Sequence, residues 1–339
     1  MCSILQGRLK FFSANVAYFS PGGNYPPVAI CKNSFTFGIV RIIAIFDRFC
    51  YIWGMTSFTR TPFPYAGCKY NLLEELDKVI PAGDTLIDMF GGSGVVAVNM
   101  AYKFKKVIYN DIMTPLVYMH RNMCKDDLET ILQKARELSS KIPEKYAELR
   151  GTYNHLQETM KQMSIADGWS ELGYRFFGLM LSCTNNLVRF NKKGGFNQTC
   201  GKRQLTDPKV IEITAWKAKL TDIPKETHTS IMFNDCSYEA YGNMDAGTVV
   251  YADPPYSNTE AGYNGGWTVE DDVKLARFIM DHMRYKWIVS SCAKDGNTTK
   301  LVEILRASGA FDERRIDYTY KASKKTKESK TEEILLVSK

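Results

Sequence analysis

An apolar run followed by a glycine loop constrains the fold of this chain more than any other feature. Residues 85–90 have the length and composition of a strand, and Gly91-Gly92-Ser93-Gly94 follows directly. Residues 95–102 are typical of a buried helix, and residues 106–109 are typical of a second strand that ends at Asn110-Asp111. A strand, a loop, a helix and a strand in this order predict the start of a parallel sheet with helices on its faces.

The glycine loop is a candidate cofactor site. Glycines at the carboxyl end of a strand let the backbone approach a ligand closely. Asp111 follows the loop after about 20 residues, the spacing at which a carboxylate can hold ribose hydroxyls. The dinucleotide pattern GxGxxG is absent, and the pattern from Phe90 through Gly92 to Gly94 suits S-adenosylmethionine (AdoMet) better. For the loop alone, an ordinary tight turn is an equally good interpretation.

A second buried strand, residues 249–252, leads into Asp253-Pro254-Pro255-Tyr256. Asp-Pro-Pro by itself is most often only a rigid turn. After a strand, however, it lies at the edge of the sheet where ligands bind. The two prolines also leave the Pro254 carbonyl without a strand partner. The context therefore favours a functional turn.

This turn matches the needs of an exocyclic amine. The N6 amine of adenine is a poor nucleophile because its lone pair is delocalised into the ring. The Asp253 carboxylate and the Pro254 carbonyl can accept its two N–H groups and aim the lone pair at a methyl group. The Tyr256 ring is then expected to stack on the base. A base inside a duplex cannot reach such a pocket and has to be flipped out.

Two basic segments are candidates for contact with nucleic acid. The stretch from Arg189 to Arg203 has no acidic residue, and Phe190 and Phe196 interleave with its basic residues. Positive charge is suited to bind phosphates, and the side chains of Arg, Lys and Asn can bind base edges. An apolar side chain can wedge into the space left by a flipped base. A second basic run lies in residues 321–330. A solvated loop explains the first composition equally well. The second run is expected to be a loop near the DNA backbone, with a merely soluble loop as the alternative.

Several motifs, in the right order, resemble the Dam-like D12 class of DNA adenine N6-methyltransferases from about residue 61 to the C-terminus. They are Pro64-Tyr65-Ala66-Gly67-Cys68-Lys69, the loop from Asp88 to Gly94, Asn110-Asp111-Ile112, the segment of residues 186–203, and the basic run of residues 321–330 with the last apolar strand. The resemblance implies AdoMet as cofactor and duplex DNA as partner, with GATC as the target sequence. The order of the motifs is that of the alpha class.

The resemblance also assigns roles to individual residues. It implies AdoMet contacts for Tyr65, Lys69, Asp111 and Asp253, to which we add Phe90, Gly92 and Gly94 from the loop. The expected catalytic residues are Asp253, Pro254 and Tyr256. The expected DNA contacts are Arg189, Phe190, Asn191, Lys192, Lys193, Lys202, Arg203, Lys324 and Lys325.

Composition excludes several other classes. The nine cysteines are odd in number, widely spaced and without a CxxC pair, which argues against a zinc site or a disulfide framework and fits a reducing compartment. The four histidines do not complete a metal set. The best candidate for a membrane span, residues 37–53, is too short and is interrupted by Arg41, Asp47 and Arg48. The net charge of +7 is compatible with nucleic acid but does not demonstrate it.

We therefore expect an α/β protein with a Rossmann-like, mixed, mostly parallel sheet and a mainly helical recognition insert. In the insert, residues 130–158 form a charged helical stretch and residues 169–187 are an apolar helix candidate. The expected divisions are 1–54, an extension of unknown role, with Met55 near the start of the catalytic unit; 55–125, the AdoMet-binding part; 126–227, the recognition insert; and 228–339, the catalytic part. We expect a cytoplasmic enzyme of a bacterium or a phage that is a monomer or weak dimer and needs no metal or membrane.

Three alternatives stay open at this level. The same fold can methylate another DNA sequence, or it can act on another acceptor such as RNA or cytosine N4. Cytosine N4 enzymes usually carry Ser at the first turn position and many RNA enzymes carry Asn, so Asp253 argues against these acceptors. The third alternative is a DNA-binding relative that has lost catalysis.

Overall fold

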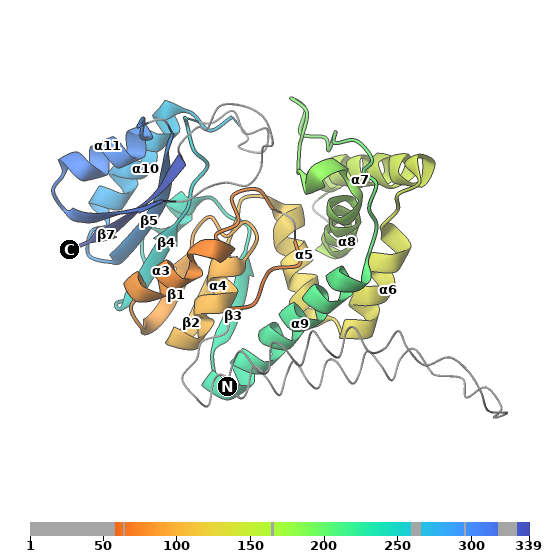
Figure 1. Cartoon of the computed structure of the whole chain (residues 1–339), viewed down its shortest axis with the longest axis horizontal. Helices are drawn as coiled ribbons and strands as arrows, with labels where there is room; N and C mark the ends of the chain where they lie inside the picture. Colours follow the sequence, from red (N-terminus) through yellow and green to blue (C-terminus); the bar gives the residue numbers. More distant parts are fainter. Residues whose placement is uncertain (1–57, 64, 164–165, 259–265, 295, 318–330) are drawn as a thin grey trace, which may run out of the picture. The chain divides into compact units, whose positions relative to one another are not determined.

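Seven strands of the computed structural model form one sheet in the order β3-β2-β1-β4-β5-β7-β6 (Figure 1). They are β1 (Gly83–Asp88), β2 (Phe104–Asn110), β3 (Ser230–Asn234), β4 (Thr248–Ala252), β5 (Lys286–Lys294), β6 (Phe311–Asp317) and β7 (Thr331–Ser338). The first five strands are parallel, and β7 runs antiparallel between β5 and β6. The expected mixed, mostly parallel sheet is confirmed. The structure describes residues 58–63, 65–163, 166–258, 266–294, 296–317 and 331–339.

The helices separate into those that cover the sheet and those of the insert. The first group comprises α3 (Leu73–Val79), α4 (Val95–Met100), α5 (Thr114–Lys125), α10 (Val269–Asp281) and α11 (Lys300–Ala307). The insert contains α6 (Leu128–Leu138), α7 (Pro143–Met163), α8 (Ala166–Ser182) and α9 (Asp207–Thr227). Short 3-10 turns lie at Tyr70–Leu72, Ala101–Lys103, Thr184–Asn186 and Tyr238–Tyr241.

Two expected helices have other bounds in the structure. The helical stretch expected over residues 130–158 is interrupted in the structure, because α6 ends at Leu138 and α7 begins at Pro143. A proline is tolerated in the first turn of a helix and disfavours helical dihedrals in the residue before it, so Pro143 separates the two. The helix expected to continue to Leu187 ends at Ser182, since the backbone of Cys183 forms an isolated antiparallel β-bridge with that of Cys200.

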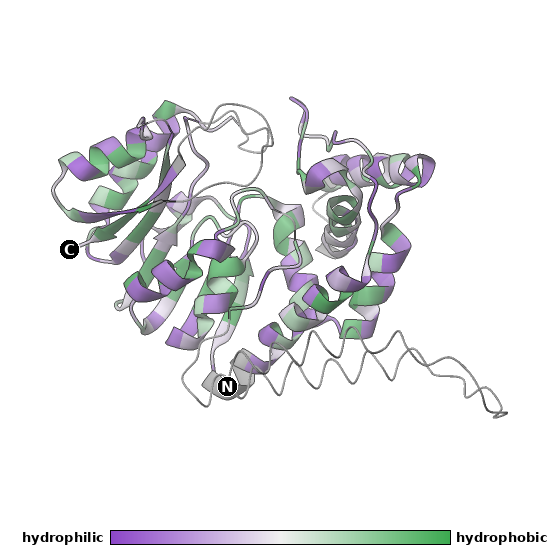
Figure 2. Cartoon of the chain, viewed as in Figure 1, coloured by the Kyte–Doolittle hydropathy of each residue, from purple (hydrophilic) through white to green (hydrophobic). Residues whose placement is uncertain are grey.

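Alternate residues of the central strands point into two cores on opposite faces of the sheet. Leu86, Val107 and Tyr251 belong to the core that includes α3 and α4. Ile87 and Trp287 belong to the core that includes α10 and α11. Figure 2 shows this as green strands between helices whose outer surfaces carry purple. Burial on both faces explains why these strands are continuous apolar runs rather than alternating ones.

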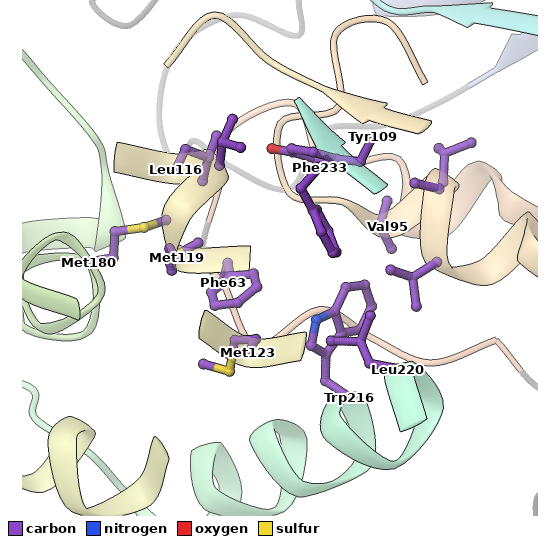
Figure 3. Packing of buried hydrophobic residues seen from close by; sticks show 14 of the residues in the cluster. Phe63, Val95, Tyr109, Leu116, Met119, Met123, Met180, Trp216, Leu220 and Phe233 are labelled. Carbon is purple, nitrogen blue, oxygen red and sulfur yellow. The ribbon is translucent and has the colours of Figure 1, made fainter. Parts of the chain in front are cut away.

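The insert shares its core with one face of the sheet. Phe63, Met119 and Trp216 meet residues of α4, β2, β3 and α8 in one continuous cluster, which Figure 3 shows from close by. Phe63 packs edge-on against both Phe177 of α8 and Trp216 of α9. The shared core positions the insert beside the carboxyl edge of the sheet. None of the helices in the part of the chain that the structure describes has the length and apolarity needed to cross a bilayer.

Candidate active site

The glycine loop follows β1, and hydrogen bonds from three side chains hold it in place. The Gly92 N–H donates to Asp111 Oδ2 at 2.9 Å. The Gly92 carbonyl accepts from the Tyr109 hydroxyl at 2.8 Å and lies 3.1 Å from His120 Nε2. Burial lowers the pKa of His120 to about 4, so the neutral ring carries its proton on Nε2 and donates it to this carbonyl.

Gly92 and Gly94 have positive φ angles, 48° and 73°. A Cβ at Gly94 would lie 2.7 Å from the His120 ring, and one at Gly92 would lie 3.0 Å from the Tyr65 ring. Only glycine fits both the backbone and the space. Gly94 precedes α4 and packs on His120, and it does not line the cavity described below.

Asp111 lies at the carboxyl end of β2, where it can face a ligand. Its Oδ1 accepts from the Met113 N–H at 2.9 Å. Burial raises the pKa of Asp111 above its usual value, although the two backbone donors oppose the shift. The neighbouring Ile112 is 76% exposed and offers an apolar surface at the rim. Together they place a carboxylate next to an apolar side chain.

Asp88, at the end of β1, is a buried acid beside the same loop. Its Oδ2 accepts from the Ala97 N–H of α4 at 3.0 Å, and Oδ1 has no hydrogen-bond partner among the described residues. Burial raises the pKa of Asp88 to about 8, and the Ala97 N–H only partly offsets this. The side chain is therefore mostly protonated at pH 7. Sequence reasoning included Asp88 in the motif but gave it no role.

A buried ion pair joins the start of the described chain to the Asp-Pro-Pro-Tyr turn. Lys69 Nζ lies 2.8 Å from Asp253 Oδ2, 2.9 Å from the Tyr256 hydroxyl and 3.0 Å from the Gly67 carbonyl. The Tyr256 hydroxyl also donates to Asp253 Oδ1 at 2.9 Å. All three ammonium protons thus have acceptors within the protein. Burial is the largest single influence and would lower the pKa of Lys69. The charge of Asp253, together with Tyr256, Glu333 and Tyr251, opposes it and holds the pKa well above the usual value.

The Asp-Pro-Pro-Tyr turn, Lys69 and Asp111 line one cavity of about 910 Å³. The cavity lies at the ends of β1 and β4, which are neighbours in the sheet. From β1 the chain builds the sheet outward through β2 and β3 on one side, and β4 and β5 follow on the other side. Open parallel sheets bind ligands at such a switch point in strand order. The cavity brings together these residues from the expected cofactor and catalytic sets: Tyr65, Lys69, Phe90, Gly92, Asp111, Asp253, Pro254 and Tyr256. It also includes residues to which the sequence assigned no role: Asp88, Ile112, Gln157, Lys161, Cys236, Tyr238 and Trp267.

The expected recognition segment forms a hairpin beside this cavity. Phe190 and Phe196 form an antiparallel bridge, and Phe190, Asn191 and Lys192 line the cavity. Phe196 is 1% exposed and belongs to the core with Tyr153, so it is not available as a wedge. The wedge role stays a prediction for Phe190, which is half-buried.

The remaining predicted DNA contacts differ in their surroundings. The Arg189 guanidinium donates to the side chain and backbone carbonyl of Asn197 across the hairpin. The Asn191 amide oxygen accepts from the Lys193 and Gly195 N–H groups and so shapes the turn. Lys193, Lys202 and Arg203 are exposed. Lys324 and Lys325 lie outside the described residues.

Comparison with known proteins identifies the family. The family model described as D12 class N6 adenine-specific DNA methyltransferase matches residues 65–330. The chain belongs to this family. As a D12 methyltransferase it depends on AdoMet and methylates adenine in DNA. No group of residues suited to hold a metal ion occurs in the described part of the chain.

Relatives of this D12 methyltransferase carry names that agree with the family. The DNA adenine methylase of Escherichia coli (strain K12) is 27% identical over 221 residues, 62% of this chain and 72% of that one. The Retron Ec67 DNA adenine methylase of Escherichia coli is 31% identical over 222 residues, 65% of this chain and 72% of that one. Modification methylase StsI of Streptococcus sanguinis is 24% identical over 299 residues, 83% of this chain but 43% of that one.

Proposed function

We propose that the enzyme transfers the AdoMet methyl group directly to N6 of an adenine flipped out of duplex DNA, within the sequence GATC. The observation that carries this proposal is the position of Asp253. It lines the same cavity as the glycine loop, Asp111 and the hairpin residues Phe190 to Lys192. A cofactor and a base from DNA can therefore meet at the same carboxylate.

The residues of the cavity fit AdoMet in size and chemistry. A volume of about 910 Å³ is in the range of small-molecule sites and leaves room for a base beside the cofactor. We assign the ribose hydroxyls to Asp111, the adenine ring to the apolar side chain of Ile112, and the methionine part to the loop at Gly92 next to Asp88. Bound AdoMet supplies a methyl group that its sulfonium already activates.

Asp253 and Pro254 are assigned the two N–H groups of the target amine. Lys69 and Tyr256 each bind one Asp253 oxygen, which fixes the carboxylate plane and leaves further lone pairs on both oxygens. A carboxylate held in advance contributes to catalysis because it does not reorganise during the reaction. Lys69 is in this proposal a positioning residue for Asp253. The AdoMet contact inferred for Lys69 from the family resemblance remains a prediction.

The hairpin is assigned to DNA. Its exposed cations, Lys193, Lys202 and Arg203, suit phosphates, whereas Asn191 and Lys192 lie at the cavity and suit bases near the target. A base held within a duplex cannot reach a recessed turn, so the adenine has to leave the stack. We retain residues 126–227 as the recognition insert and a cytoplasmic monomer or weak dimer as proposals.

GATC specificity is tested with plasmid DNA from cells that express the enzyme. We expect cleavage by a nuclease that cuts only methylated GATC and protection from one that cuts only the unmethylated sequence. Unchanged digestion together with new N6-methyladenine by mass spectrometry would show that the target sequence is a different one.

The choice of acceptor is tested by transfer of tritium from labelled AdoMet to duplex DNA, RNA and protein. We expect label in duplex DNA, on adenine N6. A preparation that binds AdoMet and labels only RNA, or only cytosine, would contradict the proposed acceptor.

A further inference from the structure

Helix α7 holds the recognition hairpin along one of its faces. Tyr146, Arg150 and Asn154 recur every four residues, so they lie on one side of the helix. The Tyr146 hydroxyl and the Arg150 guanidinium both donate to the Gln198 carbonyl, at 2.9 and 3.3 Å. The hairpin strand therefore follows the helix instead of extending freely into solvent.

Asn154 makes the closest of these attachments. Its Oδ1 accepts from the Phe196 N–H at 2.7 Å, and its Nδ2 donates to the Phe196 carbonyl at 3.1 Å. The amide thus pairs with the strand as a neighbouring strand would. The buried Phe196 ring packs against Tyr153 on the same helix. The register between hairpin and helix is fixed by polar and apolar contacts together.

The same face of α7 continues past the hairpin into the cavity. The next positions, Gln157 and Lys161, line the cavity that contains Asp253 and Tyr256. Lys161 Nζ lies close to the hairpin tip, because a Cβ built at Gly194 would be 3.4 Å from it. Among the described residues, the ion pair of Lys161 is a long contact of 3.9 Å to Glu158. The half-buried Gln157 amide has no hydrogen-bond partner within the described ranges.

We propose that Gln157 is a specificity-determining residue that reads the edge of a base next to the target adenine, while Lys161 contacts the backbone phosphate beside it. This inference rests on the proposed action on duplex DNA. A primary amide presents a donor and an acceptor side by side, which pairs with the N6 and N7 edge of adenine. In GATC such an adenine lies on the opposite strand, in the base pair that follows the target. Gln157 is held on a helix that also positions the hairpin, so its placement relative to the bases is preorganised.

The test compares methylation by the wild type, Gln157→Ala, Lys161→Ala and the matched control Lys145→Ala. Lys145 is exposed on α7 and lies outside the cavity lining. Each protein is assayed on duplexes that carry single substitutions around the preferred site, at several salt concentrations. Thermal unfolding and AdoMet affinity are measured on every variant to check fold and cofactor site.

Gln157→Ala is expected to lose discrimination at one base position by about tenfold, the value of one good amide–base contact, while AdoMet affinity is kept. Gln157→Glu is expected to move preference at that position toward cytosine, whose N4 amine needs an acceptor. Lys161→Ala should weaken binding to all duplexes alike and reduce the salt slope by about 0.9. Lys145→Ala should behave as the wild type.

Unchanged discrimination by folded Gln157→Ala, beside an active wild type, would overturn the inference and leave the proposed function standing. Loss of AdoMet affinity in Gln157→Ala would overturn it as well, because the residue would then serve the cofactor. A wild type that binds AdoMet but labels no duplex DNA would remove the proposed function and this inference together.

Discussion

The Lys69–Asp253 pair is the least expected arrangement at the scale of single residues. A lysine two residues after a glycine turn is expected to be solvated, yet Lys69 is 4% exposed and is bound to the Asp-Pro-Pro-Tyr turn. A buried cation is tolerated only when its charge and its hydrogen bonds are satisfied. The pair therefore links the segment before α3 to the turn that follows β4.

Removing Lys69 should cost both stability and activity. Breaking a buried ion pair by deleting one partner costs about 3–5 kcal/mol, and the 16% exposure of Asp253 favours the lower end of this range. Denaturant unfolding of Lys69→Met checks the stability. The double variant Lys69→Met with Asp253→Asn should be less destabilised than Lys69→Met, because it leaves no unpaired charge. Equal stabilities of the two would contradict the ion-pair account.

Removing Asp253 should separate chemistry from binding. We expect Asp253→Ala to lower the rate of methyl transfer by at least about 10²-fold, as for the loss of one preorganised electrostatic partner. Its fold and its nonspecific DNA affinity should persist, because the hairpin cations are untouched. Single-turnover methylation and DNA binding by anisotropy check the two parts. Retained activity would refute the role of Asp253.

Asp88 should make stability depend on pH. Its folded-state pKa is raised to about 8, so the stability it contributes is fully present below the unfolded-state value near 3.8 and is lost as pH rises through about 8. The expected loss is on the order of a few kcal/mol. Asp88→Asn cannot ionise and keeps an acceptor for the Ala97 N–H, so its unfolding free energy should vary less between these pH values. If the unfolding free energies of the wild type and Asp88→Asn changed equally with pH, this account of Asp88 would be contradicted.

At the scale of elements, the hairpin combines a rigid attachment with exposed charge. Its inner strand is bound to α7 through Phe196 and Gln198, whereas Lys193, Lys202 and Arg203 face solvent. The attachment limits how the charges can move relative to the Asp-Pro-Pro-Tyr turn. The hairpin is therefore suited to fix the register of the DNA.

Neutralising hairpin cations should change the salt dependence of binding. We expect Lys202→Ala with Arg203→Ala to lower the slope of log K against log salt by about 1.8, since each lost phosphate contact removes about 0.9. Titrations at several salt concentrations check this, and Lys105→Ala serves as control, because Lys105 pairs with Asp84 away from the cavity. A slope equal to that of the wild type would exclude phosphate contacts by both residues.

At the scale of the whole molecule, cofactor binding should stabilise the fold, because the cavity combines residues from several parts of the chain. A ligand at 100 times its Kd stabilises the native state by about 2.7 kcal/mol. AdoMet should therefore raise the Tm of the wild type by a few degrees, which thermal unfolding with and without AdoMet detects. Asp111→Ala should show a much smaller shift. An equal shift in both proteins would exclude Asp111 as a cofactor contact.

Much of this architecture was predictable from the chain alone. Two parts of the fold are local patterns. One is the strand, glycine loop and second strand that lead to Asp111, and the other is the strand before Asp253. Short apolar runs and glycines specify them without help from distant residues. Strand β3 escaped prediction because its burial is uneven along the strand. Helix α9 escaped it because the apolar residues of Asp207–Thr227 are only weakly segregated to one side, although Ile213, Trp216 and Leu220 are buried.

The sequence by itself determined that a glycine loop, an acidic strand end and an Asp-Pro-Pro-Tyr turn would lie at one edge of a parallel sheet, since parallel strands end on the same side. Only the tertiary structure decided that Lys69 is buried against Asp253 and that the Asp88 side chain is buried, which raises its pKa. The tertiary structure also brought Gln157 of α7 into the same cavity. Burial, pairing and protonation depend on residues that are distant in sequence, and packing alone brings them together.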